Sequence, residues 1–208
     1  MSRPAPGCVA LSLVLAIGCA PVVRPSSNPH SASTFADLAP DAVAKLDTAE
    51  AAARSLRAPD SPLAALLAAV PPAAWDHHAD PPALRTDAAI FERVAASFPP
   101  RFSFVGYWTL PLSREIGFDG FGDRIGLSTR KLRSLDAMAY AGILWHEVAH
   151  KAGYVHDGDR RTGNECAVPY LLGDAARIAA PRAVSGAWGR LPDDACPGLV
   201  TALAAQPR

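Results

Sequence analysis

The sequence has no excess of charge of either sign and few aromatic side chains. It contains 20 Lys and Arg and 20 Asp and Glu among 208 residues, so its formal net charge is zero. Without a long basic run, the chain lacks the electrostatic signature of a nucleic-acid-binding protein. Aromatic residues make up only 7% of the chain, and alanine supplies much of its hydrophobic content. We therefore expect a modest core in which helices pack through small side chains.

Long apolar runs and internal repeats are also missing. The apolar run over residues 9–17 is too short to span a bilayer as a permanent helix, and no other segment is long and apolar enough. No period of about 20 to 50 residues indicates a repeat protein. One compact domain therefore accounts for most of the chain.

The N-terminal segment is predicted to be an export signal. Arg3 gives a short positive start, and the apolar run ends in the letters LAIGC at Cys19. This ending resembles a bacterial lipobox, with Ala16 where leucine is usual. The resemblance implies that residues 1–18 are a lipoprotein signal peptide and that acylated Cys19 anchors the protein to a membrane of the bacterial cell envelope, on its periplasmic or surface side. An ordinary secretory signal is the alternative.

Cysteine is scarce beyond this segment. After Cys19 only Cys166 and Cys196 remain. In an exported protein a lone pair of cysteines usually forms a disulfide, and neither has a second Cys or His at C-x-x-C spacing for a zinc site. We therefore predict a Cys166–Cys196 disulfide that ties the C-terminal tail back to the rest of the domain.

The domain is expected to begin after a linker. Residues 20–40 contain four prolines and four serines with few large apolar side chains, so we predict that residues 19–40 form a disordered tether. Residues 41–208 then form one domain, with a helical N-terminal part over 41–100 and a C-terminal part over 101–208.

Apolar spacing and helix-stop signals divide this domain into elements. Helices are predicted over 41–57, 61–70 and 86–97, strands over 102–109 and 124–128, and short helices over 173–180 and 198–205. The glycine-rich stretch 117–123 is predicted to be a turn rather than a calcium loop, because it lacks the ligand spacing of such loops. A buried helix capped by Ser134 or Asp136 contains Gly142, which would allow a neighbouring element to pack closely.

That buried helix ends in a metal-binding pattern. The stretch from His146 to His156 reads HEVAHKAGYVH and fits H-E-x-x-H-x-x-G-x-x-H at every specified position. His146 and His150, four residues apart, lie on one helix face. Gly153 permits the chain to leave the helix and return His156 as a third imidazole. Three ligands leave a fourth position open for water, as in catalytic zinc sites, and Glu147 can deprotonate that water.

The stretch resembles the zinc motif of metzincin metallopeptidases, within the zincin class. The resemblance implies zinc bound by His146, His150 and His156, with Glu147 as general base, in an α+β fold with a small sheet, a long metal-binding helix and additional N-terminal helices. It also implies that the strand over 125–128 pairs with an extended substrate. The methionine turn of metzincins is missing, because Met1 and Met138 both precede the motif. The segment V-P-Y over 168–170 resembles one in uncharacterised bacterial proteins with this motif and is a hypothetical substitute for that turn.

Further polar residues near the motif have open roles. Asp157 could orient a ligand ring or be a solvated turn residue. Tyr170 could hydrogen-bond an oxyanion or be a buried structural tyrosine. Glu165, preferred less than His156 as third ligand, could cap a helix, pair with an arginine or contact substrate. The adjacent His77 and His78 are predicted to lie in a surface loop rather than to form an accessory metal site.

We therefore predict an exported, lipid-anchored zinc hydrolase, most simply a peptidase acting on a peptide or protein substrate. One alternative is a lipoprotein that binds a peptide or partner in a zincin-shaped cleft without turnover. The other is a structural zinc site with a fourth protein ligand, Glu165 or Asp159. A catalytic site predicts a folded apoprotein, and a structural site predicts loss of folding when zinc is chelated.

Overall fold

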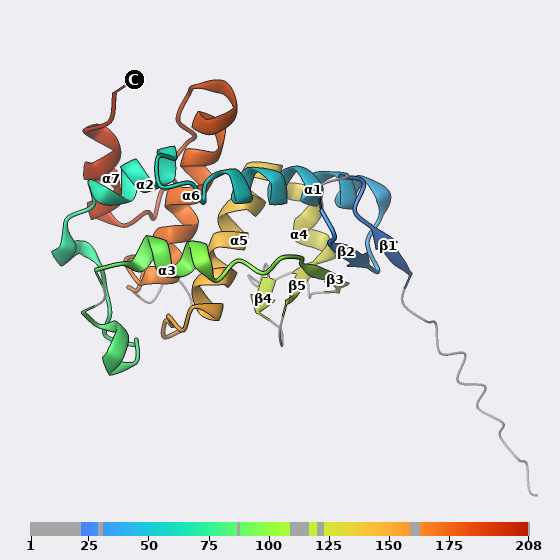
Figure 1. Cartoon of the computed structure of the whole chain (residues 1–208), viewed down its shortest axis with the longest axis horizontal. Coiled ribbons are helices and arrows are strands. Elements are labelled where there is room, and N and C mark those ends of the chain that lie inside the picture. The colour runs from blue at the N-terminus through green and yellow to red at the C-terminus, as the bar shows by residue number, and fades with distance from the viewer. Residues whose placement is uncertain are drawn as a thin grey trace, which may run out of the picture.

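The computed structural model describes residues 22–28, 31–86, 88–108, 117–119, 123–158 and 163–207. Within these ranges the fold is mixed α+β, with a small five-stranded sheet beside a layer of helices (Figure 1). The strands are β1 (Val23–Pro25), β2 (Thr34–Ala36), β3 (Ser103–Tyr107), β4 (Gly117–Asp119) and β5 (Arg124–Ser128). The helices are α1 (Pro40–Ser55), α2 (Pro62–Ala68), α3 (Ile90–Ala96), α4 (Thr129–Ser134), α5 (Ala137–Lys151), α6 (Val168–Ser185) and α7 (Pro197–Ala204), with short 3-10 turns at Pro72–Ala74 and Pro82–Leu84. No helix among the described residues is long and apolar enough to cross a membrane.

The N-terminal strands correct the prediction of a disordered tether over residues 19–40. β1 pairs antiparallel with β2, and β2 pairs parallel with β3. Phe35 of β2 is fully buried and stacks on Phe104, with ring centroids 5.2 Å apart. The serines between β1 and β2 donate hydrogen bonds to two buried carboxylates of α1, Asp47 and Glu50. The polar side chains between β1 and β2 therefore form specific hydrogen bonds with α1, which a disordered tether would not do. Residues 1–21, which include Cys19 and the predicted signal peptide, lie outside the described residues.

The sheet has the order β1-β2-β3-β5-β4, with β4 antiparallel to β5. Residues 117–119, predicted to be part of a turn, form the edge strand β4, while 120–122 of the same stretch lie outside the described residues. β5 pairs with β3 on one side and β4 on the other. The expectation that residues 125–128 pair with a substrate is therefore wrong, because β4 already occupies that side of β5.

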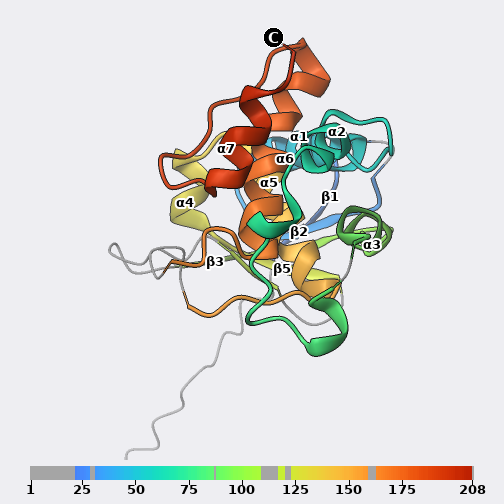
Figure 2. The same cartoon turned by 90° about the vertical axis from the view of Figure 1, so that its left-hand side faces the viewer.

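The helix α5 packs against both α6 and α1, and the three helices lie together in the view of Figure 2. Its Trp145 is fully buried and donates a hydrogen bond from Nε1 to the Ala53 carbonyl of α1, at 3.1 Å. The α5 helix contacts α6 at two glycines, Gly142 and Gly173. A Cβ added at Gly142 would lie 2.5 Å from the Gly173 carbonyl oxygen. The predicted close approach at Gly142 is therefore present.

The α6 helix is longer than predicted. It begins at Val168 rather than 173 and ends where Gly186 takes a left-handed conformation, with φ of 79°. Pro169 fits at its first turn, where the missing N–H would have no helical partner. As a consequence Tyr170 belongs to a helix that packs on α5, and the N-terminal end of α6 lies near the C-terminal end of α5.

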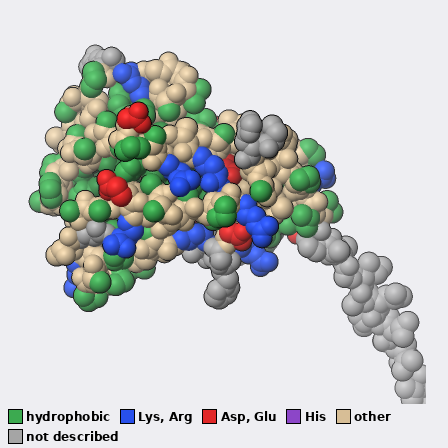
Figure 3. Space-filling view, in the orientation of Figure 1, with side chains coloured by type: hydrophobic (Ala, Val, Ile, Leu, Met, Phe, Trp, Pro, Cys, Tyr) green, Lys and Arg blue, Asp and Glu red, His purple; other side chains and the backbone are tan. Residues whose placement is uncertain are grey.

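On the face of the molecule shown in Figure 3, Lys and Arg side chains gather between α1 and α3, and no histidine is visible.

Candidate metal centre

Three histidines meet where α5 ends. Asp136 caps the start of this helix by accepting a hydrogen bond from the Ala139 N–H, at 2.7 Å. The helix carries His146 and His150 on one face, and the chain then reverses at Gly153, whose φ of 99° disfavours any residue with a side chain. After the turn, His156 returns to the helix, and ligand atoms of the three half-buried imidazoles lie within 4.8 Å of one another.

Hydrogen bonds orient two of the rings. His150 Nδ1 lies 2.9 Å from the Tyr154 carbonyl oxygen, and His156 Nδ1 lies 2.9 Å from that of Gly158. Because a carbonyl can only accept, each Nδ1 carries the proton, and the Nε2 lone pair of the neutral ring faces the centre. The His146 Nε2 lies 3.2 Å from Nε2 of His150 and 3.3 Å from Nε2 of His156.

The two Nε2 separations from His146 are compatible with a shared metal ion. In tetrahedral coordination with metal–nitrogen bonds of about 2.05 Å, two ligand nitrogens are about 3.3 Å apart. The three imidazoles therefore form a group that could hold a metal ion. Convergence of nitrogen lone pairs is also electrostatically unfavourable unless a cation or proton lies among them.

The local environment keeps one ligand neutral. Burial lowers the pKa of His156 below its ordinary value of 6.5, and the nearby His150 lowers it further. A neutral imidazole is the form that binds a metal ion. Burial therefore favours, at His156, the form of the ring that can bind a metal ion.

Glu147 follows the first ligand on α5 and is 4% exposed. Glu147 is therefore a buried acidic residue next to the first histidine of the cluster in the sequence.

Tyr170 is the aromatic neighbour of the histidines. Its ring stacks on His156, with centroids 4.3 Å apart and planes 29° apart, and lies 4.8 Å from the His146 ring. Its hydroxyl donates to the Gly158 carbonyl oxygen at 3.4 Å. Tyr170 thus supports the ligand rings from α6 and contacts the loop that carries His156.

The other two candidates lie outside the metal cluster. Asp157 is exposed, and its Oδ2 lies 3.3 Å from His78 Nε2, whereas the Gly158 carbonyl orients the His156 ring. Glu165 is half-buried in the turn before α6, and among the described residues the metal-ligating group contains only the three histidines. Among the described residues, His156 rather than Glu165 is the third member of the cluster, and Asp159 lies outside the described residues.

The histidine pair upstream lies in a loop, as predicted. His78 is exposed and its Nδ1 contacts Asp76, which raises the pKa of His78 through a hydrogen bond and its charge. His77 Nδ1 instead lies 2.8 Å from Oδ2 of Asp80, a fully buried carboxylate.

Sequence reasoning did not single out Asp80 or Asn164, which hold the loop around His156. The Val155 N–H donates to Asp80 Oδ1 at 2.8 Å. Asn164, which is 3% exposed, donates from Nδ2 to the carbonyl oxygens of Asp157 and Gly158. Asp80 is 75 residues from its partner in sequence, so no local pattern could indicate the contact.

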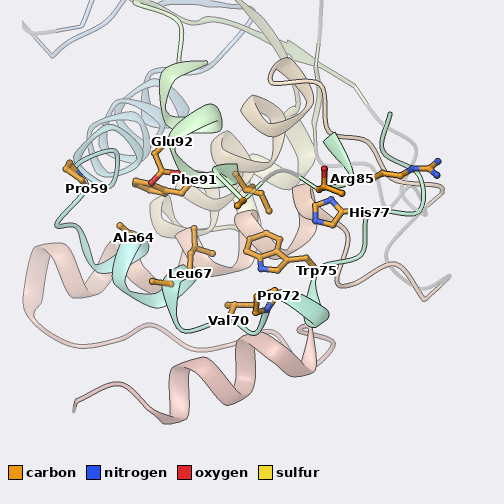
Figure 4. A pocket seen from close by; sticks show the side chains of 14 residues that line it. Pro59, Ala64, Leu67, Val70, Pro72, Trp75, His77, Arg85, Phe91 and Glu92 are labelled. Carbon is orange, nitrogen blue, oxygen red and sulfur yellow. The ribbon is translucent and has the colours of Figure 1, made fainter. Parts of the chain in front are cut away.

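A separate cavity of about 560 Å³ is lined in part by residues of the 75–85 segment (Figure 4). Its walls come from α2 and α3, with Trp75, His77 and Arg85 along one side. None of the three clustered histidines lines it.

Comparison of the chain with protein-family models, curated proteins and solved structures found no match.

Proposed function

We propose that the protein is a zinc-dependent hydrolase of zincin type, most simply a peptidase. The observation that carries the proposal is the convergence of three imidazoles, with His146 Nε2 3.2 Å and 3.3 Å from the Nε2 atoms of His150 and His156, next to a buried glutamate in the sequence. His146, His150 and His156 would hold the ion. Zinc so bound supplies an activated water and polarises a substrate carbonyl.

In this proposal the protein's own groups move the protons. Glu147 takes a proton from the attacking water and passes it to the leaving amine of the cleaved peptide bond. Tyr170 holds the His156 ring by stacking, and an added hydrogen bond from its hydroxyl to the developing oxyanion remains a prediction. The carbonyl oxygens of Tyr154 and Gly158 keep two imidazoles in the ligand tautomer.

The surrounding fold supports a zincin-like assignment. A mixed sheet with an antiparallel edge strand, β4, contacts the helix that carries the histidines. The aromatic ring of Tyr170 lies against His146 and His156, and we propose that the segment over 168–170 substitutes for the methionine turn of metzincins. We further propose export and membrane anchoring through Cys19. The Cys166–Cys196 disulfide, with Cα atoms 4.9 Å apart, is compatible with an oxidising compartment.

The test compares wild type with Glu147→Gln and His156→Ala. Wild type should bind one zinc ion and cleave unstructured peptides in a manner that chelators abolish. The Gln variant should keep its zinc but lose about 10²- to 10⁴-fold in rate, because only the proton acceptor is removed. The His156→Ala variant should bind zinc more weakly.

Each alternative predicts a different result. A binding protein would hold zinc without chelator-sensitive cleavage. A structural zinc site would unfold on chelation, whereas a catalytic site leaves a folded apoprotein. Equal hydrolysis by wild type and the Gln variant would show that Glu147 is not the general base.

A further inference from the structure

We propose that Asp80 is a positioning residue for the metal centre, holding the loop that returns His156 to α5. This inference rests on the proposed metal site but not on hydrolysis. Asp80 belongs to the segment before the 3-10 turn Pro82–Leu84, far from the motif in sequence. Its role follows from the hydrogen-bond partners of its two carboxylate oxygens.

Asp80 is 0% exposed, and burial of a carboxylate is unfavourable unless both oxygens find donors. Oδ1 accepts from the Val155 N–H at 2.8 Å, and Oδ2 lies 2.8 Å from His77 Nδ1. The Asp80 main chain is also fixed, since its N–H donates to the His77 carbonyl and its carbonyl accepts from Arg85 Nε at 2.9 Å. The carboxylate is therefore a rigid acceptor aimed at the residue before His156.

The loop needs such a fixed point. Tyr154 is fully buried, but Val155 is 38% exposed, so its side chain contributes little packing to hold the backbone. Beyond His156, Asn164 holds the carbonyls of Asp157 and Gly158. Asp80 on one side and Asn164 on the other thus fix the main chain around the third ligand.

The segment carrying Asp80 is itself attached to the start of α6. The Asp76 N–H donates to the Cys166 carbonyl at 2.9 Å, forming an isolated parallel bridge to Ala167. Since Cys166 is bonded to Cys196, the disulfide, the 76–80 segment and the His156 loop form one connected structure. Outer partners of this kind typically change metal affinity by about 10- to 100-fold when removed.

The experiment measures zinc affinity of Asp80→Ala, Asp80→Asn and a matched control, Asp136→Ala, by competition with a chromophoric chelator. Asp136 also accepts a backbone N–H, but it caps α5 away from the loop. We expect Asp80→Ala to lower affinity about 10- to 100-fold, Asn to restore most of it through its remaining oxygen, and Asp136→Ala to leave it unchanged. The cobalt-substituted Asp80→Ala protein should also show an altered visible spectrum.

A double-mutant cycle tests whether Asp80 changes zinc affinity through His156. If Asp80 acts through His156, adding Asp80→Ala to His156→Ala should cause no further loss of affinity. An equal loss in both backgrounds, or none in the wild-type background, overturns the proposal. If Asp80→Ala does not fold, hydrogen exchange in the wild-type apoprotein decides: the Val155 N–H should be protected although the residue is exposed, and rapid exchange overturns the proposal. A protein that binds zinc without hydrolysis would contradict the proposed function and leave the role of Asp80 intact.

Discussion

Replacing Gly142 by Ala tests whether α5 and α6 must meet backbone to backbone. A Cβ at this position would lie 2.5 Å from the Gly173 carbonyl oxygen and 2.9 Å from the Cβ of Arg177. Neither atom is the flexible end of a side chain, so α6 must shift away. Overpacking of this kind costs up to about 3 kcal/mol, whereas the better helix propensity of Ala returns about 1 kcal/mol. The expected net loss is about 2 kcal/mol of unfolding free energy.

Urea unfolding of the metal-free protein, with its disulfide intact and followed by circular dichroism, measures this loss. Gly173→Ala is the matched control, because its Cβ would meet the Gly142 oxygen at 3.1 Å and the His146 Cβ at 3.2 Å, and so should cost less. The Gly142 variant should also bind zinc more weakly, since Tyr170 moves with α6. A Gly142→Ala protein at least as stable as wild type would refute the close-contact argument.

Three other predictions concern the disulfide, the N-terminal strands and pH. Replacing Cys166 and Cys196 together by Ala should lower the free energy of unfolding by about 3–4 kcal/mol in urea, and equal stability would contradict a bridge that constrains the unfolded chain. Phe35→Ala should cost about 3–5 kcal/mol, and a loss below about 1 kcal/mol would show that β2 is not part of the core. Zinc affinity, titrated between about pH 5 and 8, should fall as the imidazoles gain protons on acidification. Because the pKa of His156 lies below its ordinary 6.5, protons compete for this ring only at lower pH; affinity unchanged across the range would contradict imidazole ligation.

The histidine cluster could be predicted because its geometry is local. His146 and His150 are one helical turn apart, and the positive φ at Gly153 determines where the chain goes next. The start of α5 was predicted from two candidate capping residues, Ser134 and Asp136, and Asp136 is the one that accepts the Ala139 N–H.

Contacts between distant segments could not be predicted. The serines before β2 resemble linker composition, and only the carboxylates of α1, about twenty residues later, turn them into specific partners. Similarly, Asp80 is an ordinary loop aspartate until the Val155 N–H is placed beside it. β4 was not predicted because a strand of only three residues, Gly117–Asp119, with glycine and aspartate at its ends, carries little strand signal of its own.

The placement of β1 in the sheet changes how a lipid at Cys19 would position the domain relative to a membrane. Val23, the first residue of β1, is four positions after that cysteine, and a fully extended chain covers at most about 14 Å over that interval. A disordered tether of 22 residues would have allowed the domain to move much further from the membrane. On the proposed acylation, the sheet edge with exposed Val22 and Val23 instead lies near the lipid headgroups, and the proposed hydrolase would act only on substrates close to that surface.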